Sequence, residues 1–432
     1  MFELNVQQKE ALKTMKDWFE SDEKYMTLEG AAGTGKTTIV VEFCKYLKSE
    51  KQKRIVATGA TNAVVLLLRE NLSKHNIPST TIHRFLGLKV TNNKDVSILK
   101  KEDDDICAFD LVVVDECSMI DKQLWETITS HSSTKTKWLF VGDPCQLSPV
   151  KCDLSDTFNV KTIVCLNKVE RQSATNPMKS ILHKLRDSIR DESFHIPQLA
   201  SNINEQKSGI IYFDRNQIEE WFSLTVRYFK SDKYKDVNSG RVITFKNSTE
   251  AYFNRMIRNQ VLESKEEFTI DENVILKTPH VEKGSVVLST NDTFTINKIK
   301  PIKIEPHRIH WRLPEYSVDG YLLTGRCGYI ETALKVVSPE SITDFDNWKK
   351  KTVKQWKSEN ERNVWQAWNS FTESICDVSY PYATTVRRLQ GTTIEVGFPI
   401  LDDLISCPGR HNKIRNLYAA LTRASRLVVA LQ

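Results

Sequence analysis

The sequence predicts an α/β protein in which helices cover both faces of a mainly parallel sheet. Short β-rich runs alternate with helical patterns through the first 180 residues, and this alternation is typical of such sheets. A glycine-rich segment at 30–37 stands between an expected strand and an expected helix. A second α/β region begins near Ser180 and resumes near Thr384, so we expect two such regions.

The elements of the two regions follow from runs of apolar and β-branched residues. In the first region we expect strands at Tyr25–Leu28, Arg54–Thr58, Leu111–Val114, Trp138–Val141 and Thr162–Leu166, with helices at Thr37–Lys48 and Ala60–Leu72. In the second region we expect a strand at Val242–Phe245, a helix at Thr249–Leu262 and a closing helix and strand at Asn416–Ala424 and Leu427–Leu431.

The chain changes character between about Asn273 and Ser379. Short expected strands with turn signals come first, at Val286–Leu288 and Thr293–Ile299, and a basic, tryptophan-rich helical stretch follows at Asp346–Phe371. We interpret this part as a small β-barrel with a helical extension, inserted into the second α/β region.

Composition excludes several classes of protein. With 432 residues, 40% hydrophobic and 27% charged, the chain has globular composition and room for roughly three domains. The net charge of +6 permits a polyanionic partner without requiring one. Nine cysteines without a C-x-x-C pair argue against a disulfide framework or zinc ribbon, and favour a reducing, cytoplasmic location. We expect no membrane span, because no apolar run approaches about 20 residues, and no signal peptide, because the N-terminus lacks a basic region followed by an apolar stretch.

The glycine-rich segment has the pattern G-x-x-x-x-G-K-T, which is specific for a phosphate-binding loop when a strand precedes it and a helix follows. Its backbone N–H groups and the helix N-terminus can surround phosphates. Lys36 can reach the β- and γ-phosphates, and Thr37 can hold Mg²⁺. The residues expected to bind nucleotide are Gly30, Ala31, Ala32, Gly33, Thr34, Gly35, Lys36, Thr37 and Thr38.

Polar residues end the next two apolar strands. Asp115 and Glu116 follow Leu111–Val114; Asp115 can complete the Mg²⁺ site, and Glu116 can accept a proton from the attacking water. Gln146 follows the strand at Trp138–Val141, at the edge of a parallel sheet where ligands bind. It could contact the γ-phosphate and the water.

These motifs, in the order GAAGTGKT, DECS, GDPCQLSPV and a late LYAALTRAS, resemble those of superfamily 1 helicases. The chain is most similar to the RecD-like subgroup that moves 5′ to 3′, and within it to the Dda-type helicases of phages. The resemblance spans essentially the whole chain, and it is strong over 1–175 and 380–432 and loose over 180–380.

The resemblance implies two RecA-like P-loop NTPase domains. The first is 1–180 with a β-hairpin (pin) insertion at about 86–108, and the second comprises 181–272 and 380–432. An SH3-like barrel with the tryptophan-rich extension is then inserted at 273–379. The implied activity is ATP-dependent unwinding of DNA coupled to 5′-to-3′ movement on a single strand.

Further residue roles rest on the resemblance alone. Gln8 matches the glutamine that reads adenine in the family, with Gln7 as the alternative. Arg171 and Arg423 match its two arginine fingers, whose planar cations can stabilise charge on the transferring phosphoryl group.

Segments that contact nucleic acid in the family are also present. They include Thr61, Asn62, Thr81, His83, Thr385 and Arg387. For the threonines, helix capping is an equally sensible role. Arg387 replaces the histidine of the family pattern T-x-H-K-x-Q-G; it keeps a positive charge on the strand track and could still stack on a base.

Two further features suit DNA contact. Five of the nine tryptophans lie between Trp311 and Trp368; among them Trp365 and Trp368 are our candidates for stacking on bases, with packing in the insertion's own core as the alternative. The expected hairpin between His83 and Asp115 could split the duplex, with Ile98 or Leu99 against the last base pair and an ordinary surface hairpin as the alternative.

The expected cofactors are ATP and Mg²⁺, and the expected partners are single-stranded DNA and duplex junctions, with replication or recombination proteins beside them. We expect the protein to be a monomer and to be located in the cytoplasm. If a phage encodes the protein, this is the cytoplasm of the host cell. A phosphate-loop kinase would not need the second α/β region or the basic insertion. An accessory protein that only switches on ATP binding would not need the Asp115-Glu116 pair.

Overall fold

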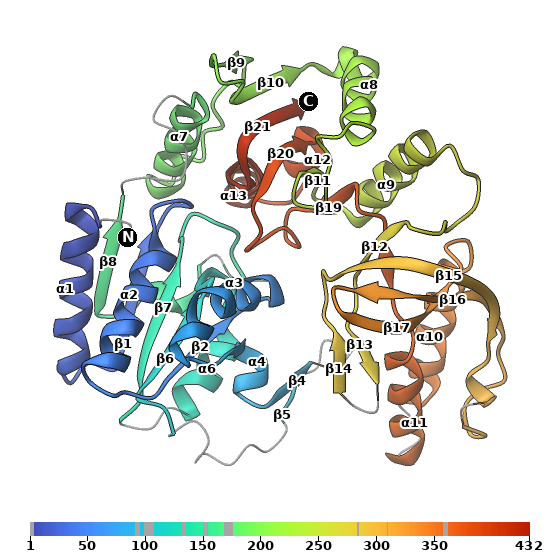
Figure 1. Cartoon of the computed structure of the whole chain (residues 1–432), viewed down its shortest axis with the longest axis horizontal. Coiled ribbons are helices and arrows are strands. Elements are labelled where there is room, and N and C mark those ends of the chain that lie inside the picture. The colour runs from blue at the N-terminus through green and yellow to red at the C-terminus, as the bar shows by residue number, and fades with distance from the viewer. Residues whose placement is uncertain are drawn as a thin grey trace. The chain divides into compact units, whose positions relative to one another are not determined.

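The computed structural model describes residues 4–90, 96–98, 108–131, 135–149, 152, 154–167, 176–282, 285–308, 310–356 and 362–432. The chain divides into two compact units (Figure 1). Unit 1 comprises 1–225, 238–249 and 384–432, and unit 2 comprises 226–237 and 250–383. Among the residues that the structure describes, every helix is too short or too polar to cross a membrane.

Unit 1 contains two sheets, and the first has the strand order β3-β2-β6-β7-β1-β8. All its strands are parallel. They are β1 (Tyr25–Gly30), β2 (Ile55–Gly59), β3 (Ser79–Thr81), β6 (Leu111–Asp115), β7 (Lys137–Gly142) and β8 (Thr162–Leu166). The expected parallel α/β architecture is therefore confirmed in this region.

Helices cover both faces of this sheet because its central strands are apolar on both sides. On β6, Leu111 and Val113 pack into one cluster with α1, α2 and α3, whereas Val112 and Val114 pack into another with α4 and α6. Side chains alternate between faces along a strand, so a continuous apolar run fills two cores. The helices are α1 (Val6–Glu20), α2 (Lys36–Ser49), α3 (Asn62–Leu72), α4 (Ile82–Phe85) and α6 (Lys122–His131).

A small hairpin leaves the first sheet after α4. Strands β4 (Leu88–Val90) and β5 (Val96–Ile98) pair antiparallel, with Leu88 opposite Ile98. Residues 91–95 and Leu99 lie outside the described part of the chain.

The second sheet of unit 1 has the order β19-β11-β20-β21-β10-β9. Strands β11, β20, β21 and β10 are parallel, and β9 pairs antiparallel with β10. The strands are β9 (Asn202–Ile203), β10 (Gly209–Phe213), β11 (Gly240–Thr244), β19 (Ala383–Thr385), β20 (Ile394–Pro399) and β21 (Ala424–Leu431).

Helices also cover the second sheet, and the alternation along β21 again separates two faces. Val428 and Ala430 pack with α7 and α13, and Val429 between them is buried as well, so side chains on both faces of β21 are covered; its carbonyl also accepts a hydrogen bond from the indole of Trp221 on α8. These helices are α7 (Met178–Arg190), α8 (Ile218–Phe229), α12 (Leu401–Leu404) and α13 (Arg410–Arg423).

Unit 2 is built around an antiparallel sheet of order β17-β16-β15-β12-β18. Its strands are β12 (Asn273–Leu276), β15 (Thr293–Ile304), β16 (Val318–Cys327), β17 (Ile330–Val337) and β18 (Val378–Ser379), and β13 (His280–Glu282) and β14 (Ser285–Leu288) form a separate hairpin. Its helices are α10 (Ile342–Trp356), α11 (Arg362–Glu373) and most of α9 (Asn247–Leu262).

Candidate functional site

The phosphate-binding loop connects β1 to α2, as the sequence predicts. Gly33 and Gly35 have φ of +83° and +85°, which glycine adopts without a steric penalty. At Gly30 an added Cβ would lie 2.9 Å from the carbonyl oxygen of Leu166. The glycines therefore permit both the turn and the close approach of β8, and α2 begins at Lys36 with its N–H groups facing the loop.

Lys36 folds back over this loop. Its Nζ donates to the carbonyl oxygens of Gly30 and Ala31, at 2.7 and 3.1 Å. The ammonium thus lies beside the N-terminus of α2, where a phosphate could replace these carbonyls as its partner.

The two candidate glutamines make different contacts at the start of α1. Gln8 is buried, forms a capping box with Asn5, and donates from Nε2 to the carbonyl of Thr34 at 3.1 Å. Gln7 bridges the backbone at the end of β8, donating to Cys165 and accepting from the N–H of Asn167. Gln8 therefore contacts the loop directly, and Gln7 does not in this arrangement.

The acidic pair stands at the end of β6, between Gly59 of β2 and Val141 of β7. Burial, and after it the charge of the neighbouring Glu116, raise the pKa of Asp115 to about 6, although the charge of Lys36 acts to lower it. Glu116 has a φ of +52°, an uncommon conformation for a residue with a side chain. Such strain is found at functional sites, where the surrounding structure maintains it.

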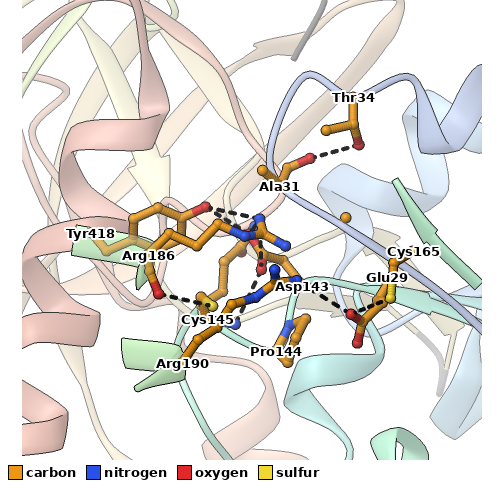
Figure 2. A network of polar contacts seen from close by, with 12 residues as sticks. Glu29, Ala31, Thr34, Asp143, Pro144, Cys145, Cys165, Arg186, Arg190 and Tyr418 are labelled. Atoms are coloured by element: carbon orange, nitrogen blue, oxygen red, sulfur yellow. Dashed lines mark hydrogen bonds and ion pairs between the residues drawn. The ribbon is translucent and has the colours of Figure 1, made fainter. Parts of the chain in front are cut away.

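The loop after β7, residues 142–149, is held by side chains from the second sheet's helices (Figure 2). Asp143 is fully buried and accepts a hydrogen bond from the hydroxyl of Tyr418 at 2.9 Å. Nη1 of Arg186 lies 3.4 Å from both carboxylate oxygens of Asp143. Arg415 donates to the carbonyl oxygens of Pro144 and Gln146. The position of this loop is therefore fixed by side chains of α7 and α13 as well as by β7.

Gln146 lies inside this loop and is 2% exposed. Its backbone carbonyl is bound by Arg415, but its Oε1 has no hydrogen-bond partner among the described residues. A buried amide oxygen without a partner is unusual and suits a ligand that donates a hydrogen bond, such as a water molecule.

Arg423 ends α13 and is also buried. Nη1 donates a long hydrogen bond of 3.5 Å to the carbonyl of Thr392, and Nε has no partner among the residues described. Its neighbours Thr422 and Ala424 line the pocket described next. Arg171, the second finger candidate, lies outside the described residues.

A pocket within unit 1 joins the phosphate-binding loop to the second sheet's helices. The pocket is open to solvent, and the space that it outlines, solvent included, is about 580 Å³. Its lining residues are Ala31 and Ala32 of the loop, Asn167, four residues of α7 (Lys179, Leu182, His183 and Arg186), Thr393, and Tyr418, Thr422, Ala424 and Ser425 from α13 and β21. A nucleotide held by the loop would therefore be in reach of both sheets.

The nucleic-acid candidates Thr61 and Thr81 are both helix N-caps. Thr61 Oγ1 accepts from the N–H of Val64, and Thr81 Oγ1 accepts from the N–H of Arg84. Asn62 opens α3 and His83 lies in α4, where burial lowers the pKa of its imidazole. Capping, the alternative role, is thus present at both threonines.

The segment after β19 approaches the first sheet. Thr385 is 6% exposed, so its side chain is buried, whereas Arg387 is exposed and donates from Nη2 to the carbonyl of Ser148 at 3.3 Å. Gly391 has a φ of +78°, and a Cβ there would lie 2.5 Å from Val64 of α3. The contact of Thr385 with DNA stays a prediction, and Arg387 is the more exposed of the two candidates in this segment.

The two tryptophan candidates lie in a core of unit 2. Trp368 is 4% exposed and packs against Trp348 and Phe371, with ring centroids 5.3 and 5.9 Å away. Trp365 is half-buried against the same cluster. The prediction that Trp368 stacks on a base is therefore wrong, because a buried ring has no face to offer.

Replacing Trp368 with alanine should destabilise unit 2 by about 3–5 kcal/mol, since truncating a buried aromatic leaves a cavity. Thermal unfolding followed by circular dichroism measures the loss. Trp311, which is 78% exposed, provides the control, and Trp311→Ala should melt close to the parent protein. If the Trp368→Ala variant unfolded at the same temperature as the parent protein, the packing role of Trp368 would be contradicted.

Sequence reasoning missed Arg186, Tyr418 and Arg415 as parts of the site. Tyr418 lies in the late LYAALTRAS segment, which could have indicated it. For Arg186 the available signal was the spacing of Lys179, His183 and Arg186, which places three basic residues on one helix face.

Comparisons with known proteins find relatives among DNA helicases. A family model described as an AAA domain matches residues 3–208. The ATP-dependent DNA helicase dda of Enterobacteria phage T4 is 22% identical over 427 aligned residues, and the alignment covers 92% of each protein. The RecBCD enzyme subunit RecD of Buchnera aphidicola subsp. Acyrthosiphon pisum is 25% identical over 277 residues, covering 56% of this chain and 45% of that protein.

Solved helicase structures share the fold. The Pif1 helicase from Candida albicans has a TM-score of 0.51 at 13% identity, covering 100% of this chain and 94% of its own. The Pif1 helicase from Bacteroides, in complex with ADP-AlF3 and ssDNA, has a TM-score of 0.51 at 15% identity, covering 99% and 92%. The motifs and these relatives make the chain similar to superfamily 1 helicases of the type that includes RecD and Dda, and it shares the fold of the Pif1 helicases.

Proposed function

We propose that the protein hydrolyses ATP to move 5′ to 3′ on single-stranded DNA and to unwind duplex DNA ahead of it. The observation that carries this proposal is the pocket that joins the phosphate-binding loop to α7, α13 and β21. A nucleotide that contacts both sheets can draw them together, and its hydrolysis can release them. If the two RecA-like halves bind the single strand tightly in alternation, each closure of the two halves moves the protein along the strand in one direction.

Residues of both sheets act on the reaction. Lys36 and the arginines Arg171 and Arg423 stabilise the charge of the transferring phosphoryl group. Glu116 accepts the proton of the attacking water, and Gln146 orients that water through its free Oε1. Gln8 holds the loop at Thr34 and would read the adenine of the bound nucleotide.

Mg²⁺ fits the donor set at the end of β6. Asp115 is buried with one carboxylate oxygen bound by the N–H of Glu116, and its pKa is raised first by burial and then by the charge of Glu116, which a divalent cation would offset. Asp115 and the hydroxyl of Thr37 would hold the ion, with the remaining oxygen ligands from phosphate and water. When bound, Mg²⁺ supplies further stabilisation of phosphate charge.

The single strand would run over loops that follow the strands of both sheets. Thr61, Asn62, Thr81 and His83 would contact it from the first sheet, and Arg387 from the second. The β4–β5 hairpin would act as the pin that meets the duplex, with Ile98 or Leu99 against the last base pair. The SH3-like barrel with its helical extension, at 273–379, would be the inserted domain of the second RecA-like half.

The polarity is tested with duplexes that carry matched 5′ or 3′ single-stranded tails, excess ATP and a trap strand. We expect the 5′-tailed substrate to open and the 3′-tailed substrate to remain closed. Efficient opening of the 3′-tailed substrate alone would contradict the direction while leaving the ATPase intact.

The same preparation decides whether the ATPase is coupled to nucleic acid. Hydrolysis should rise sharply when single-stranded DNA is added, and a matched single-stranded RNA shows which nucleic acid is preferred. If neither single-stranded DNA nor single-stranded RNA raised the rate of ATP hydrolysis, the proposed motor function would be contradicted. We propose that replication or recombination proteins are further partners and that the protein acts in the cytoplasm, of the host if a phage encodes it. We also propose that it is a monomer, which sedimentation of the purified protein tests.

A further inference from the structure

Helix α7 turns a basic face toward the nucleotide pocket. Lys179, His183 and Arg186 all line it and are four and three residues apart, which places them on one side of the helix. Lys184, on the same helix, is exposed and does not line the pocket.

Arg186 is the buried member of this face, and its guanidinium is only partly satisfied. Its side chain is 9% exposed, and Nη1 lies 3.4 Å from the carboxylate oxygens of Asp143 and 3.5 Å from the hydroxyl of Tyr418. Nη2 is buried and has no hydrogen-bond partner among the described residues. A guanidinium always carries its charge, so an unpaired buried N–H is costly and favours an anionic acceptor.

The opposite wall of the pocket belongs to the phosphate-binding loop. Ala31 and Ala32 line the pocket, and the carbonyl of Ala31 accepts a hydrogen bond from Nζ of Lys36. Lys36 is the cation that reaches the β- and γ-phosphates. The pocket therefore borders the loop that is expected to hold the phosphates, and Arg186 belongs to the same lining; Figure 2 labels Ala31 of this loop and Arg186.

We propose that Arg186 contacts the terminal phosphate of the bound nucleoside triphosphate through Nη2, as a further nucleotide-binding residue beside Lys36 and Arg423. This inference rests on the proposed ATPase function. Asp143 and Tyr418 orient the guanidinium from its other side. Because Asp143 also accepts a hydrogen bond from the N–H of Cys145, the contact ties the terminal phosphate to the loop that carries Gln146.

The experiment measures binding without DNA, by calorimetry in Mg²⁺ buffer, with ADP and with a non-hydrolysable ATP analogue. Hydrogen bonds to charged groups are worth about 1.5–3 kcal/mol, so Arg186→Ala should lose about 10- to 100-fold in affinity for the analogue. Its affinity for ADP should change by less than about threefold if the terminal phosphate is the partner. Lys184→Ala removes an equal charge from the same helix and should bind both nucleotides normally.

Two additional variants separate the contact from folding, because Arg186→Ala leaves Asp143 buried without its cation. Arg186→Lys keeps a charge beside Asp143, and Arg186→Gln combined with Asp143→Asn removes both charges together. Each should lose analogue affinity selectively while melting near the parent protein.

Unchanged affinity for the analogue in a folded Arg186 variant would overturn the proposal, and so would equal losses for the analogue and ADP. These outcomes are independent of the motor function. A parent protein that binds and hydrolyses ATP without responding to DNA would refute the motor and leave the Arg186 contact standing.

Discussion

Replacing Lys36 with alanine is expected to nearly abolish ATP hydrolysis. In this structure the ammonium is held by two loop carbonyls, at 2.7 and 3.1 Å, beside the N-terminus of α2. The variant leaves the γ-phosphate without the cation that stabilises its developing charge. Removing one such electrostatic partner costs about 10²–10³ in turnover, and a full charge at the phosphate costs at least as much. Steady-state release of phosphate, measured with saturating single-stranded DNA, reports the loss.

The fold should tolerate the Lys36 variant. Lys36 is only half-buried, and water can replace its ammonium at the carbonyls of Gly30 and Ala31. Lys48→Ala, in the last turn of the same helix, is the matched control and should keep full activity. Turnover retained in a folded Lys36→Ala protein would remove the phosphate-binding loop from the mechanism.

Glu116→Gln is expected to separate nucleotide binding from chemistry. The amide keeps the shape of the carboxylate but cannot accept a proton from water. General-base catalysis contributes about 10²–10⁴ in rate, so turnover should fall by that factor while ATP affinity stays near the parent value. Single-turnover hydrolysis and equilibrium binding of ATP measure the two effects in the same preparation.

The conformation of Glu116 makes this prediction specific. Its φ of +52° fixes the backbone at the end of β6, and the substitution leaves that backbone unchanged. Glu126→Gln, on the exposed surface of α6, controls for the loss of a negative charge. An affinity loss as severe as that of Lys36→Ala would make Glu116 a binding residue instead of the base.

Local sequence was enough to predict the candidate nucleotide site, because its parts lie at strand ends. A parallel sheet gathers the carboxyl ends of its strands at one edge, so Gly30, Asp115 and Gln146 converge once β1, β6 and β7 are adjacent. The apolar runs of these strands are long enough to fill two cores, and the glycines of the loop permit its turn. Motif and periodicity therefore sufficed for this half of the site.

The tertiary structure decided what each remaining side chain can reach. Basic and aromatic residues interleave between Asp346 and Phe371, but burial in a core removes Trp368 from DNA contact, and the sequence pattern is the same for a buried and an exposed ring. Arg186 is separated from Asp143 by 43 residues and from Tyr418 by 232. Contacts over such separations depend on how two sheets and their helices pack, and no local pattern encodes that packing.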